Sequence, residues 1–322
     1  MINSEIKIKN SIRDVLNSYS LGEIIGEPVY EKDGLVNYNF WVKMESGDYM
    51  VRASSEKWQI IQKDIEHSVT DYLNESGFNY KVPIFINGNN GEKVIQKGSF
   101  FYDVYERLSG KTGNKNKTNK GIVEMVGEYH ELMRKYPERP ETWEHDPTYD
   151  RNDKFKNKLL LIKDRVDSSK NVLDITMGKY IDLAIEINQY IKNNIKLIKP
   201  SLYTHGDINF GNILFENGTP TGLIDFGNIR WGTKGRDLVF LVQDGSPANI
   251  DQLVQRYRKH ARLSDKEASN ILPECMIEKL KAFRWIYAKM DKSPEKKGQM
   301  IKELGEDLKK LFYNYKSSKS FI

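Results

Sequence analysis

The chain has 322 residues, of which 39% are hydrophobic and 30% charged; this composition excludes a largely disordered chain, and the length favours two domains over one. The net charge of +5 comes from 50 basic and 45 acidic residues spread along the chain, without the dense basic block that predicts binding to nucleic acid. The single cysteine, Cys275, excludes an internal disulfide, fits a reducing compartment and is expected to be buried.

The first predicted element is a short amphipathic helix over residues 2–16. Apolar residues recur there at helical intervals, at Ile8, Ile12, Val15 and Leu16. Charged residues interrupt the apolar ones, which excludes a signal peptide, and no later segment approaches the length of a membrane span. We therefore expect a cytoplasmic protein without a membrane partner.

An antiparallel sheet is predicted next. Three short segments rich in β-branched and aromatic residues are separated by turn-like sequences, at 23–30, 38–44 and 48–54. Residues 58–76 return to helical spacing and end at Gly77, a plausible C-terminal cap. Further strands are expected at 82–86 and 93–108, with a hairpin turn at 87–92.

The character of the sequence changes near residue 108. A polar joint rich in glycine, lysine and asparagine, at 109–121, leads into segments with helical spacing at 122–135, 179–198, 276–290 and 300–312. A small β insert is expected around 213–225. These features predict an N-terminal domain at 1–107 and a mainly helical C-terminal domain at 108–322.

Three oxygen-bearing side chains occur close together in the second domain. Asp207 lies in HGDINFGN, Asn212 follows five residues later, and Asp225 opens Asp-Phe-Gly after an apolar run. Phosphoryl transfer requires a positioned acceptor hydroxyl and metal ions that neutralise the phosphates. Carboxylate and amide oxygens suit Mg²⁺, so a hairpin that joins Asn212 and Asp225 would form a metal site. Asp207 is then free to act as the general base.

The same residues carry a family resemblance. HGDINFGN followed by IDFG resembles the catalytic loop and metal-binding motif of the aminoglycoside phosphotransferase family, relatives of the protein kinases. GLVNYNFWV is similar to the family's phosphate-covering hairpin, which implies nucleotide contacts from Gly34 and Asn37. Arg52 stands where the family usually carries Lys or Arg, and Glu66 matches the helix glutamate that would pair with it.

The resemblance extends from about Leu21 to Leu241. VYERLSG resembles the hinge between the lobes, which implies that the backbone of Tyr105, Glu106 and Leu108 meets the nucleotide base. GRDL, with Asp237, resembles the family's closing motif. Two departures stand out: the first hairpin has no G-x-G-x-x-G, and Arg52 is a planar cation, able to clamp the α- and β-phosphates but bulkier than Lys.

The resemblance implies a bilobal, protein-kinase-like α+β fold, with a small antiparallel β lobe, a larger helical lobe, and ATP or GTP with Mg²⁺ in the cleft between them. The implied activity is transfer of the γ-phosphate to a hydroxyl of a small molecule. Aminoglycosides and other antibiotics, sugars, choline-like alcohols and homoserine are candidate acceptors, and an antibiotic acceptor would imply a role in resistance. The motif does not choose among them, nor does it predict the oligomeric state.

An acidic and aromatic stretch at 137–155 lies where the family inserts helices that line the acceptor pocket. Its Glu141, Glu144, Asp146 and Asp150 are expected either to attract a cationic acceptor or to belong to a solvated loop.

Several residues have structural explanations. Asp237 is expected to bond the backbone of the catalytic loop, His205 to be a structural hydrogen-bonding group, and His130 to be a core histidine. Arg52 and Glu66 could be ordinary surface charges. The histidines and the cysteine show no spacing of a zinc site.

Two other functions compete with the small-molecule kinase. One is a catalytically idle kinase-fold protein that acts as a binding or spore-coat component. The other is a protein kinase, which is disfavoured because no activation segment of ordinary length fits between Asp225 and the GRDL motif.

Overall fold

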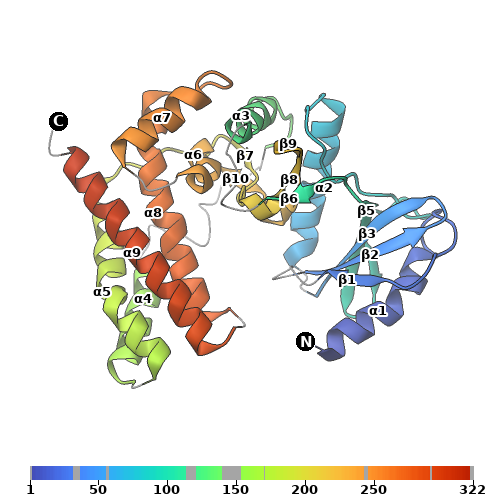
Figure 1. Cartoon of the computed structure of the whole chain (residues 1–322), viewed down its shortest axis with the longest axis horizontal. Coiled ribbons are helices and arrows are strands. Elements are labelled where there is room, and N and C mark those ends of the chain that lie inside the picture. The colour runs from blue at the N-terminus through green and yellow to red at the C-terminus, as the bar shows by residue number, and fades with distance from the viewer. Residues whose placement is uncertain are drawn as a thin grey trace. The chain divides into compact units, whose positions relative to one another are not determined.

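The protein is described by a computed structural model that covers residues 2–31, 37–55, 58–113, 121–139, 154–169, 171–242, 246–290 and 292–319. The chain forms two compact units, which are described separately (Figure 1). Unit 1 comprises Met1–Lys120 together with Phe210–Ile229, and unit 2 comprises Gly121–Asn209 together with Arg230–Ile322.

Unit 1 is built on an antiparallel sheet with the strand order β1-β2-β3-β5-β4. The strands are β1 (Val29–Glu31), β2 (Tyr38–Met44), β3 (Gly47–Ser54), β4 (Ile95–Lys97) and β5 (Phe100–Glu106). The predicted first helix is present as α1 (Ile2–Leu16), and its buried Ile8 and Ile12 pack with Phe40, Val51 and Val104 from one face of the sheet. This contact forms the hydrophobic core of the unit.

The opposite face of this sheet carries polar side chains. The strand register aligns Asn39 of β2, Arg52 of β3 and Asp103 of β5 in one row, because residues directly opposite each other on neighbouring strands point to the same face. Helix α2 (Trp58–Glu75) packs over this row and contributes Glu66, which bonds to Arg52. The two faces of the sheet therefore differ in kind: one is core and the other is charged.

A second, three-stranded sheet completes unit 1. Its order is β6-β8-β9, with β6 (Lys111–Thr112), β8 (Ile213–Glu216) and β9 (Thr219–Leu223). The β8–β9 hairpin lies between two short 3₁₀ turns, η1 (Phe210–Asn212) and η2 (Phe226–Asn228). Backbone bonds from Lys81 to Thr221 and from Leu223 to Lys81 join this hairpin to the N-terminal part of the chain.

Unit 2 is mainly helical. Its long helices are α3 (Ile122–Met133), α4 (Lys154–Asp167), α5 (Val172–Asn194), α7 (Pro247–Tyr257), α8 (Asp265–Ala288) and α9 (Pro294–Lys319). A two-stranded sheet pairs β7 (Leu202–Thr204) with β10 (Arg230–Gly232), and the short α6 (Lys234–Leu238) and η3 (Val239–Leu241) follow. Helices α4, α5, α8 and α9 enclose the core, which includes Met177, Ile181, Leu280 and Phe312.

Sequence-local signals explain where several helices begin. The side chain of Asn171 accepts a hydrogen bond from the backbone of Asp174 and caps α5. Ser264 and Glu267 form a capping box at the start of α8. Cys275, as expected, is buried in this helix.

Three strand predictions need correction. Only Val29–Glu31 of the expected strand at 23–30 is a strand, and Ile24 makes an isolated bridge to Met44. The expected strand at 82–86 is absent, because Phe85 makes only an isolated bridge to Tyr105. The expected strand at 93–108 is two strands, β4 and β5, which turn at Gly98 and Ser99, and Gly98 adopts a positive φ of 60° that permits this tight turn. The turn expected at 87–92 is present, with the backbone N–H of Gly88 bonded to the carbonyl oxygen of Glu92, but it does not join two strands.

The helical predictions in unit 2 were incomplete. Each of the helices predicted near 179–198, 276–290 and 300–312 starts earlier than expected, and α4 and α7 were not predicted. The predicted β insert is present as β8 and β9. The contacts group this insert with unit 1, whereas the predicted domain boundary after residue 107 followed the change from strands to helices and stays a prediction.

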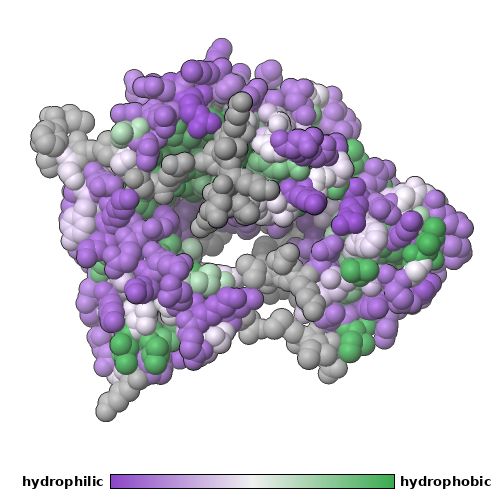
Figure 2. Space-filling model, in the orientation of Figure 1, coloured by the Kyte–Doolittle hydropathy of each residue, from purple (hydrophilic) through white to green (hydrophobic). Residues whose placement is uncertain are grey.

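The surface and the helices carry no sign of a membrane segment. No helix in the described ranges combines the length and apolar character needed to cross a bilayer. The face drawn in Figure 2 is mainly hydrophilic over both units, with small hydrophobic patches.

Candidate active site

The β8–β9 hairpin brings the two predicted metal-binding residues together. Asn212 precedes β8, and Asp225 follows β9 by two residues. The backbone N–H of Ile224 donates to the carbonyl oxygen of Asn212 at 2.9 Å. This bond places Asn212 beside the residue that precedes Asp225, so the expected hairpin juxtaposition is confirmed for the backbone.

Asp225 has an unusual backbone conformation. Its φ of 61° and ψ of 64° lie in the left-handed region, which costs a residue with a side chain of the order of 1–2 kcal/mol. The side chain is exposed, and within the described part of the chain it makes no hydrogen bond or ion pair. A carboxylate and an amide oxygen, the groups that Asp225 and Asn212 carry, have the donor chemistry that Mg²⁺ prefers.

Asp237 accepts hydrogen bonds from the backbone of the loop that carries Asp207. The backbone N–H groups of His205 and Gly206 donate to Asp237 Oδ2 and Oδ1 at 3.0 and 2.6 Å. Gly206 has a positive φ of 78°, a conformation that glycine adopts without strain. The expected structural role of Asp237, as an acceptor for the catalytic-loop backbone, is therefore confirmed.

Asp237 is itself fixed by a buried histidine. His130 is fully buried on α3, with Nε2 3.0 Å from Asp237 Oδ2 and Nδ1 2.7 Å from the hydroxyl of Tyr257. Burial alone would raise the pKa of Asp237, but the hydrogen bond and charge of His130, together with the backbone N–H of Gly206, lower it. His130 is thus the core histidine that was expected.

Asp207 belongs to unit 2 and is half-buried. Its Oδ1 accepts a hydrogen bond from Asn209 Nδ2 at 2.7 Å, and its backbone N–H lies 3.3 Å from His205 Nδ1. These contacts orient the carboxylate.

The predicted partners Arg52 and Glu66 do meet, inside unit 1. Arg52 Nη1 and Nη2 donate to the two oxygens of Glu66 at 2.8 Å each. Their side chains are only 6% and 2% exposed, so the alternative that they are ordinary surface charges is wrong. Bidentate geometry of this kind is the strong form of an arginine–carboxylate pair.

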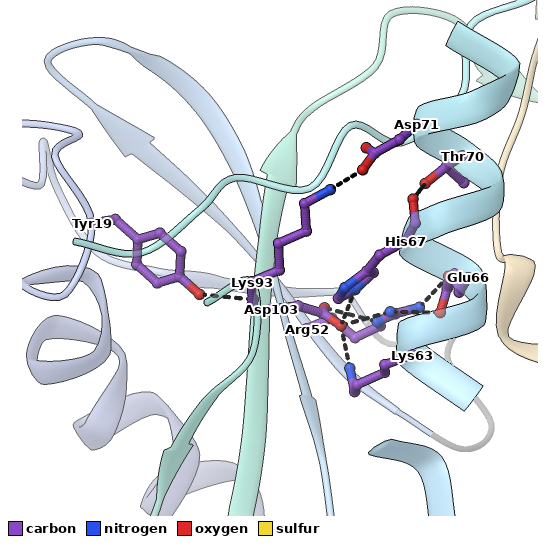
Figure 3. A network of polar contacts seen from close by, with 9 residues as sticks. All are labelled: Tyr19, Arg52, Lys63, Glu66, His67, Thr70, Asp71, Lys93 and Asp103. Carbon is purple, nitrogen blue, oxygen red and sulfur yellow. Dashed lines mark hydrogen bonds and ion pairs between the residues drawn. The ribbon is translucent and has the colours of Figure 1, made fainter. Parts of the chain in front are cut away.

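The sequence did not reveal three further members of this ionic group. Asp103 accepts from Arg52 Nε at 2.9 Å and from Nη2 at 2.7 Å, and it also accepts from Lys63 (Figure 3). His67 Nε2 lies 3.4 Å from the same carboxylate. We call Arg52, Lys63, Glu66, His67 and Asp103 the Arg52 cluster. Asp103 could be recognised in the sequence only as a lone acidic residue inside an apolar strand.

Burial and charge act in opposite directions within the Arg52 cluster. Burial would raise the pKa of Asp103, but the charges of Arg52 and Lys63 hold it well below its usual range. Burial would lower the pKa of Arg52, and the two carboxylates raise it instead. The ion pairs of Arg52 with Glu66 and Asp103 and of Lys63 with Asp103 therefore bring two basic and two acidic side chains together in a buried group.

The predicted hinge residues Tyr105, Glu106 and Leu108 lie at the end of strand β5 or just after it. The Tyr105 ring lies in edge contact with Phe85, with 5.2 Å between centroids, and Phe85 in turn lies under Arg52. The pKa of the Tyr105 hydroxyl is raised, first by burial and then by the carboxylates of Asp103, Asp225 and Glu66 against the charge of Arg52. Tyr105 is thus close to both the Arg52 cluster and the carboxylate of Asp225.

The remaining hinge residues lie at the end of this strand. Glu106 pairs with Tyr49 across the sheet, and Leu108 follows the strand. The backbone N–H of Arg107, between them, donates to Asp48. The assignment of Glu106 and Leu108 to the nucleotide base stays a prediction.

The polar face of the sheet also holds buried atoms without hydrogen bonds. Asn37 Oδ1, Asn39 Oδ1 and Trp41 Nε1 are buried and unpaired among the described residues. Asn39 and Trp41 alternate along β2 and so point to one face, the face of Arg52, and Asn37 immediately precedes this strand. Buried polar atoms are normally paired. Unpaired polar atoms on one face of the sheet therefore indicate a surface that can bind a polar ligand.

Some predicted residues cannot be placed. Gly34 and the acidic residues Glu141, Glu144, Asp146 and Asp150 lie outside the described residues. Among the described residues, no group of three or more His, Cys, Asp or Glu side chains is placed to hold a metal ion. The predicted metal site has one carboxylate and one amide and does not depend on such a group.

A protein-family model matches most of the chain. The model of the family described as "Phosphotransferase enzyme family" matches residues 32–269. This range contains Asp207, Asn212, Asp225, Arg52 and Glu66. A comparison with curated protein sequences gave no significant match.

Solved structures agree with the fold over nearly the whole chain. A spectinomycin phosphotransferase in complex with ADP and spectinomycin has a TM-score of 0.66 at 15% identity, over 94% of this chain and 98% of that one. A microcompartment-associated aminopropanol kinase has a TM-score of 0.67 at 14% identity, over 96% and 98%. A macrolide 2′-phosphotransferase from Brachybacterium faecium has a TM-score of 0.59 at 14% identity, over 91% and 97%. The predicted kinase-like α+β fold is confirmed.

Proposed function

Because the chain belongs to the phosphotransferase enzyme family, we propose that it is a small-molecule kinase that transfers the γ-phosphate of ATP or GTP to a hydroxyl group. The observation that supports this proposal is the β8–β9 hairpin, which bonds the backbone of Asn212 to Ile224, the residue before the strained and exposed Asp225. Asn212 follows the oriented Asp207 by five residues. A fold alone would not support it, because one fold hosts many functions.

Asp207 is the proposed general base. Its carboxylate would accept the proton of the acceptor hydroxyl while that oxygen forms a bond to the γ-phosphorus. The bond from the γ-phosphorus to the oxygen that bridges it to the β-phosphorus breaks, and the nucleoside diphosphate leaves. The hydrogen bond from Asn209 and the Asp237 contacts to the loop backbone keep the carboxylate in position.

Asn212 and Asp225 are the proposed Mg²⁺ ligands. These two side chains would hold the ion, because Mg²⁺ in nucleotide sites usually takes only one or two protein ligands beside water and phosphate oxygens. When bound, the ion neutralises negative charge on the phosphates. The left-handed backbone at Asp225 sets the direction of the carboxylate at a cost in stability, which is typical of functional positions.

Unit 1 supplies the proposed nucleotide contacts. Gly34 and Asn37 are assigned to the phosphate hairpin, and Tyr105, Glu106 and Leu108 to the base, as the family resemblance implies. Arg52 and Glu66 are assigned to the phosphate end of the site. The unpaired atoms of Asn37, Asn39 and Trp41 support a polar ligand on this face.

The acceptor is a small molecule with a free hydroxyl. Spectinomycin, macrolides and aminopropanol are named with the neighbouring structures, so antibiotics and amino alcohols are the first candidates for this chain, followed by sugars. An antibiotic acceptor would make the protein a resistance enzyme. A cationic acceptor would fit the acidic residues between 141 and 150.

The decisive experiment is an assay of ADP or GDP release with a panel of these acceptors, in the presence and absence of Mg²⁺. We expect one acceptor class to stimulate release in the wild-type chain and not in Asp207→Asn. A catalytically idle kinase-fold protein is the alternative. It would show no nucleotide-dependent rise in melting temperature, with or without Mg²⁺.

A further inference from the structure

The Arg52 cluster differs from a simple pair of one cation and one carboxylate. Figure 3 shows Arg52 between Glu66 of α2 and Asp103 of β5, with Lys63 approaching Asp103 from the same helix. All five residues of the cluster are at most 5% exposed. The cluster therefore contains a second buried pair, Lys63 with Asp103, that the sequence motif does not include.

Arg52 has little hydrogen-bonding capacity left. A guanidinium has five N–H donors, and four of those of Arg52 are taken: two by Glu66 and two by Asp103. The free N–H is on Nη1. To clamp a phosphate with two parallel bonds, Arg52 would have to leave one of its carboxylates.

Lys63 is in the opposite situation. An ammonium group has three N–H donors, and within the described part of the chain Lys63 Nζ meets one acceptor, Asp103. The side chain is only 4% exposed, so water does not replace the missing acceptors freely. Burial, and next the charge of Arg52, lower the pKa of Lys63, which indicates that its charge is incompletely compensated.

The surroundings of Lys63 favour an anionic oxygen ligand. Helix α2 packs against η2, the turn that begins immediately after Asp225. On the same polar face of the sheet, the indole N–H of Trp41, a donor, is buried and has no hydrogen-bond partner among the described residues. Lys63 is therefore a buried cation that meets a single acceptor among the described residues, on an element that adjoins the proposed metal-binding turn.

We propose that Lys63 donates the main cationic contact to the nucleotide phosphates, and that Arg52 acts with Glu66 and Asp103 to hold α2 on the sheet. This inference rests on the proposed nucleotide-dependent function and reassigns the phosphate contact that the motif gives to Arg52. The flexible four-carbon stem lets Lys63 turn toward a phosphate by releasing one bond, whereas Arg52 would have to release two or more. Asp103 keeps its two bonds to Arg52 when Lys63 turns away.

The test compares the affinities of a nucleoside triphosphate and of its nucleoside. ATP or GTP, whichever the wild-type chain binds more tightly, is titrated by calorimetry with Mg²⁺ present, and then adenosine or guanosine. We expect Lys63→Met to weaken triphosphate binding about 10- to 100-fold, the range for a hydrogen bond to a charged group, and to leave nucleoside binding unchanged. Equal losses for both ligands, or no loss, would overturn the inference.

Lys93→Met is the matched control. Lys93 also pairs with a carboxylate of α2, Asp71, but lies at the other end of the helix (Figure 3). We expect it to bind the triphosphate as the wild type does. If Lys93→Met loses as much affinity as Lys63→Met, any loosening of α2 is enough, and a direct contact from Lys63 is wrong.

The double variant Lys63→Met/Asp103→Asn separates contact from charge balance. Lys63→Met alone leaves two carboxylates against one buried cation, whereas the double variant retains the neutral Arg52–Glu66 pair. Triphosphate affinity that stays low in the double variant supports a direct contact. Affinity that returns to the wild-type value would mean that Lys63 acts only by balancing Asp103.

Folding is checked by circular dichroism and melting temperature for each variant. A wild-type chain that binds neither triphosphate contradicts the proposed function, and this inference with it. A wild type that binds, combined with a Lys63→Met variant that binds equally well, contradicts this inference alone.

Discussion

Arg52 and Asp103 lie directly opposite each other on β3 and β5, and their side chains form two hydrogen bonds of 2.9 and 2.7 Å across the sheet. Glu66 completes the arrangement from α2. Three elements of unit 1 are therefore fastened at one buried guanidinium. Removal of that guanidinium would leave two buried carboxylates with one lysine between them.

The Arg52 cluster leads to a prediction about stability. Arg52→Met should destabilise the protein by about 3–5 kcal/mol, because breaking a buried ion pair leaves an uncompensated charge. Chemical denaturation measures this loss. The surface pair of Lys279 with Asp307 is the control, since Lys279→Met should cost at most about 1 kcal/mol. Similar losses at the two sites would contradict the description of the cluster as buried and strongly coupled.

Asp207→Asn should separate binding from turnover. The amide retains the size of the carboxylate but cannot accept the hydroxyl proton, so kcat should fall by about 10²- to 10⁴-fold or more, with little change in nucleotide affinity. Steady-state kinetics and calorimetry measure the two quantities. Asp182→Asn, on the exposed surface of α5, should change neither. Retained turnover in Asp207→Asn would remove this residue from the role of base.

The substitutions Asp225→Ala and Asp225→Gly should have the same effect on function but different effects on stability. Both Asp225→Ala and Asp225→Gly remove the carboxylate, so both should weaken Mg²⁺-dependent nucleotide binding. Glycine tolerates the left-handed backbone, whereas alanine does not, so Asp225→Gly should be more stable than Asp225→Ala by about 1 kcal/mol. Melting curves compare the two variants. Unchanged metal dependence would count against Asp225 as a ligand.

The ionisation of Asp237 leads to a prediction about the stability of the protein at low pH. Its pKa in the folded protein is below the usual value of 3.8, so its contribution is complete above about pH 4 and is lost as the pH falls through the lower, folded-state pKa. Asp237→Asn should reduce stability at neutral pH and weaken the acid dependence. Thermal melts between about pH 2 and about pH 7 compare the stability of the two proteins. Parallel curves for the two proteins would show that Asp237 does not carry this dependence.

Glu274 predicts a dependence of the opposite sign. Burial raises its pKa from 4.5 to about 7, although Thr233 donates to it at 2.5 Å. The folded state therefore binds the proton more tightly than the unfolded state, and stability should fall as the pH rises from 4.5 to about 7, by up to about 1.4 kcal/mol per pH unit. Glu274→Gln should flatten this slope. A slope that persists in the variant would assign it to another group.

The sequence contained enough local information for much of the fold. Helix α1 was predicted from the spacing of Ile8 and Ile12, and the β8–β9 hairpin was predicted as a small β insert around 213–225. The strand expected at 82–86 was wrong because its apolar run is buried by packing, with an isolated bridge at Phe85 in place of a ladder. Apolar periodicity cannot distinguish these two kinds of burial.

The candidate site was predictable only where its residues are close in sequence. Asp207, Asn212 and Asp225 lie within one short motif. Asp103 lies 51 residues from Arg52, and the two meet only through the register of β3 with β5. Lys63 was one of many lysines, and its burial depends on how α2 packs over the polar face. Such relations arise from tertiary structure, and one sequence does not contain a local signal for them.

The division of unit 1 into two sequence segments has a consequence for how the protein folds during synthesis. Its three-stranded sheet needs both β6, in the first segment, and the hairpin that ends before Ile229, in the second. The first segment of unit 2, Gly121–Asn209, must therefore be synthesised before unit 1 can be completed. Until then the N-terminal segment lacks the β8–β9 hairpin, and the backbone of Lys81 lacks its partners Thr221 and Leu223. Chaperones and proteases have the most access to the segment during this interval.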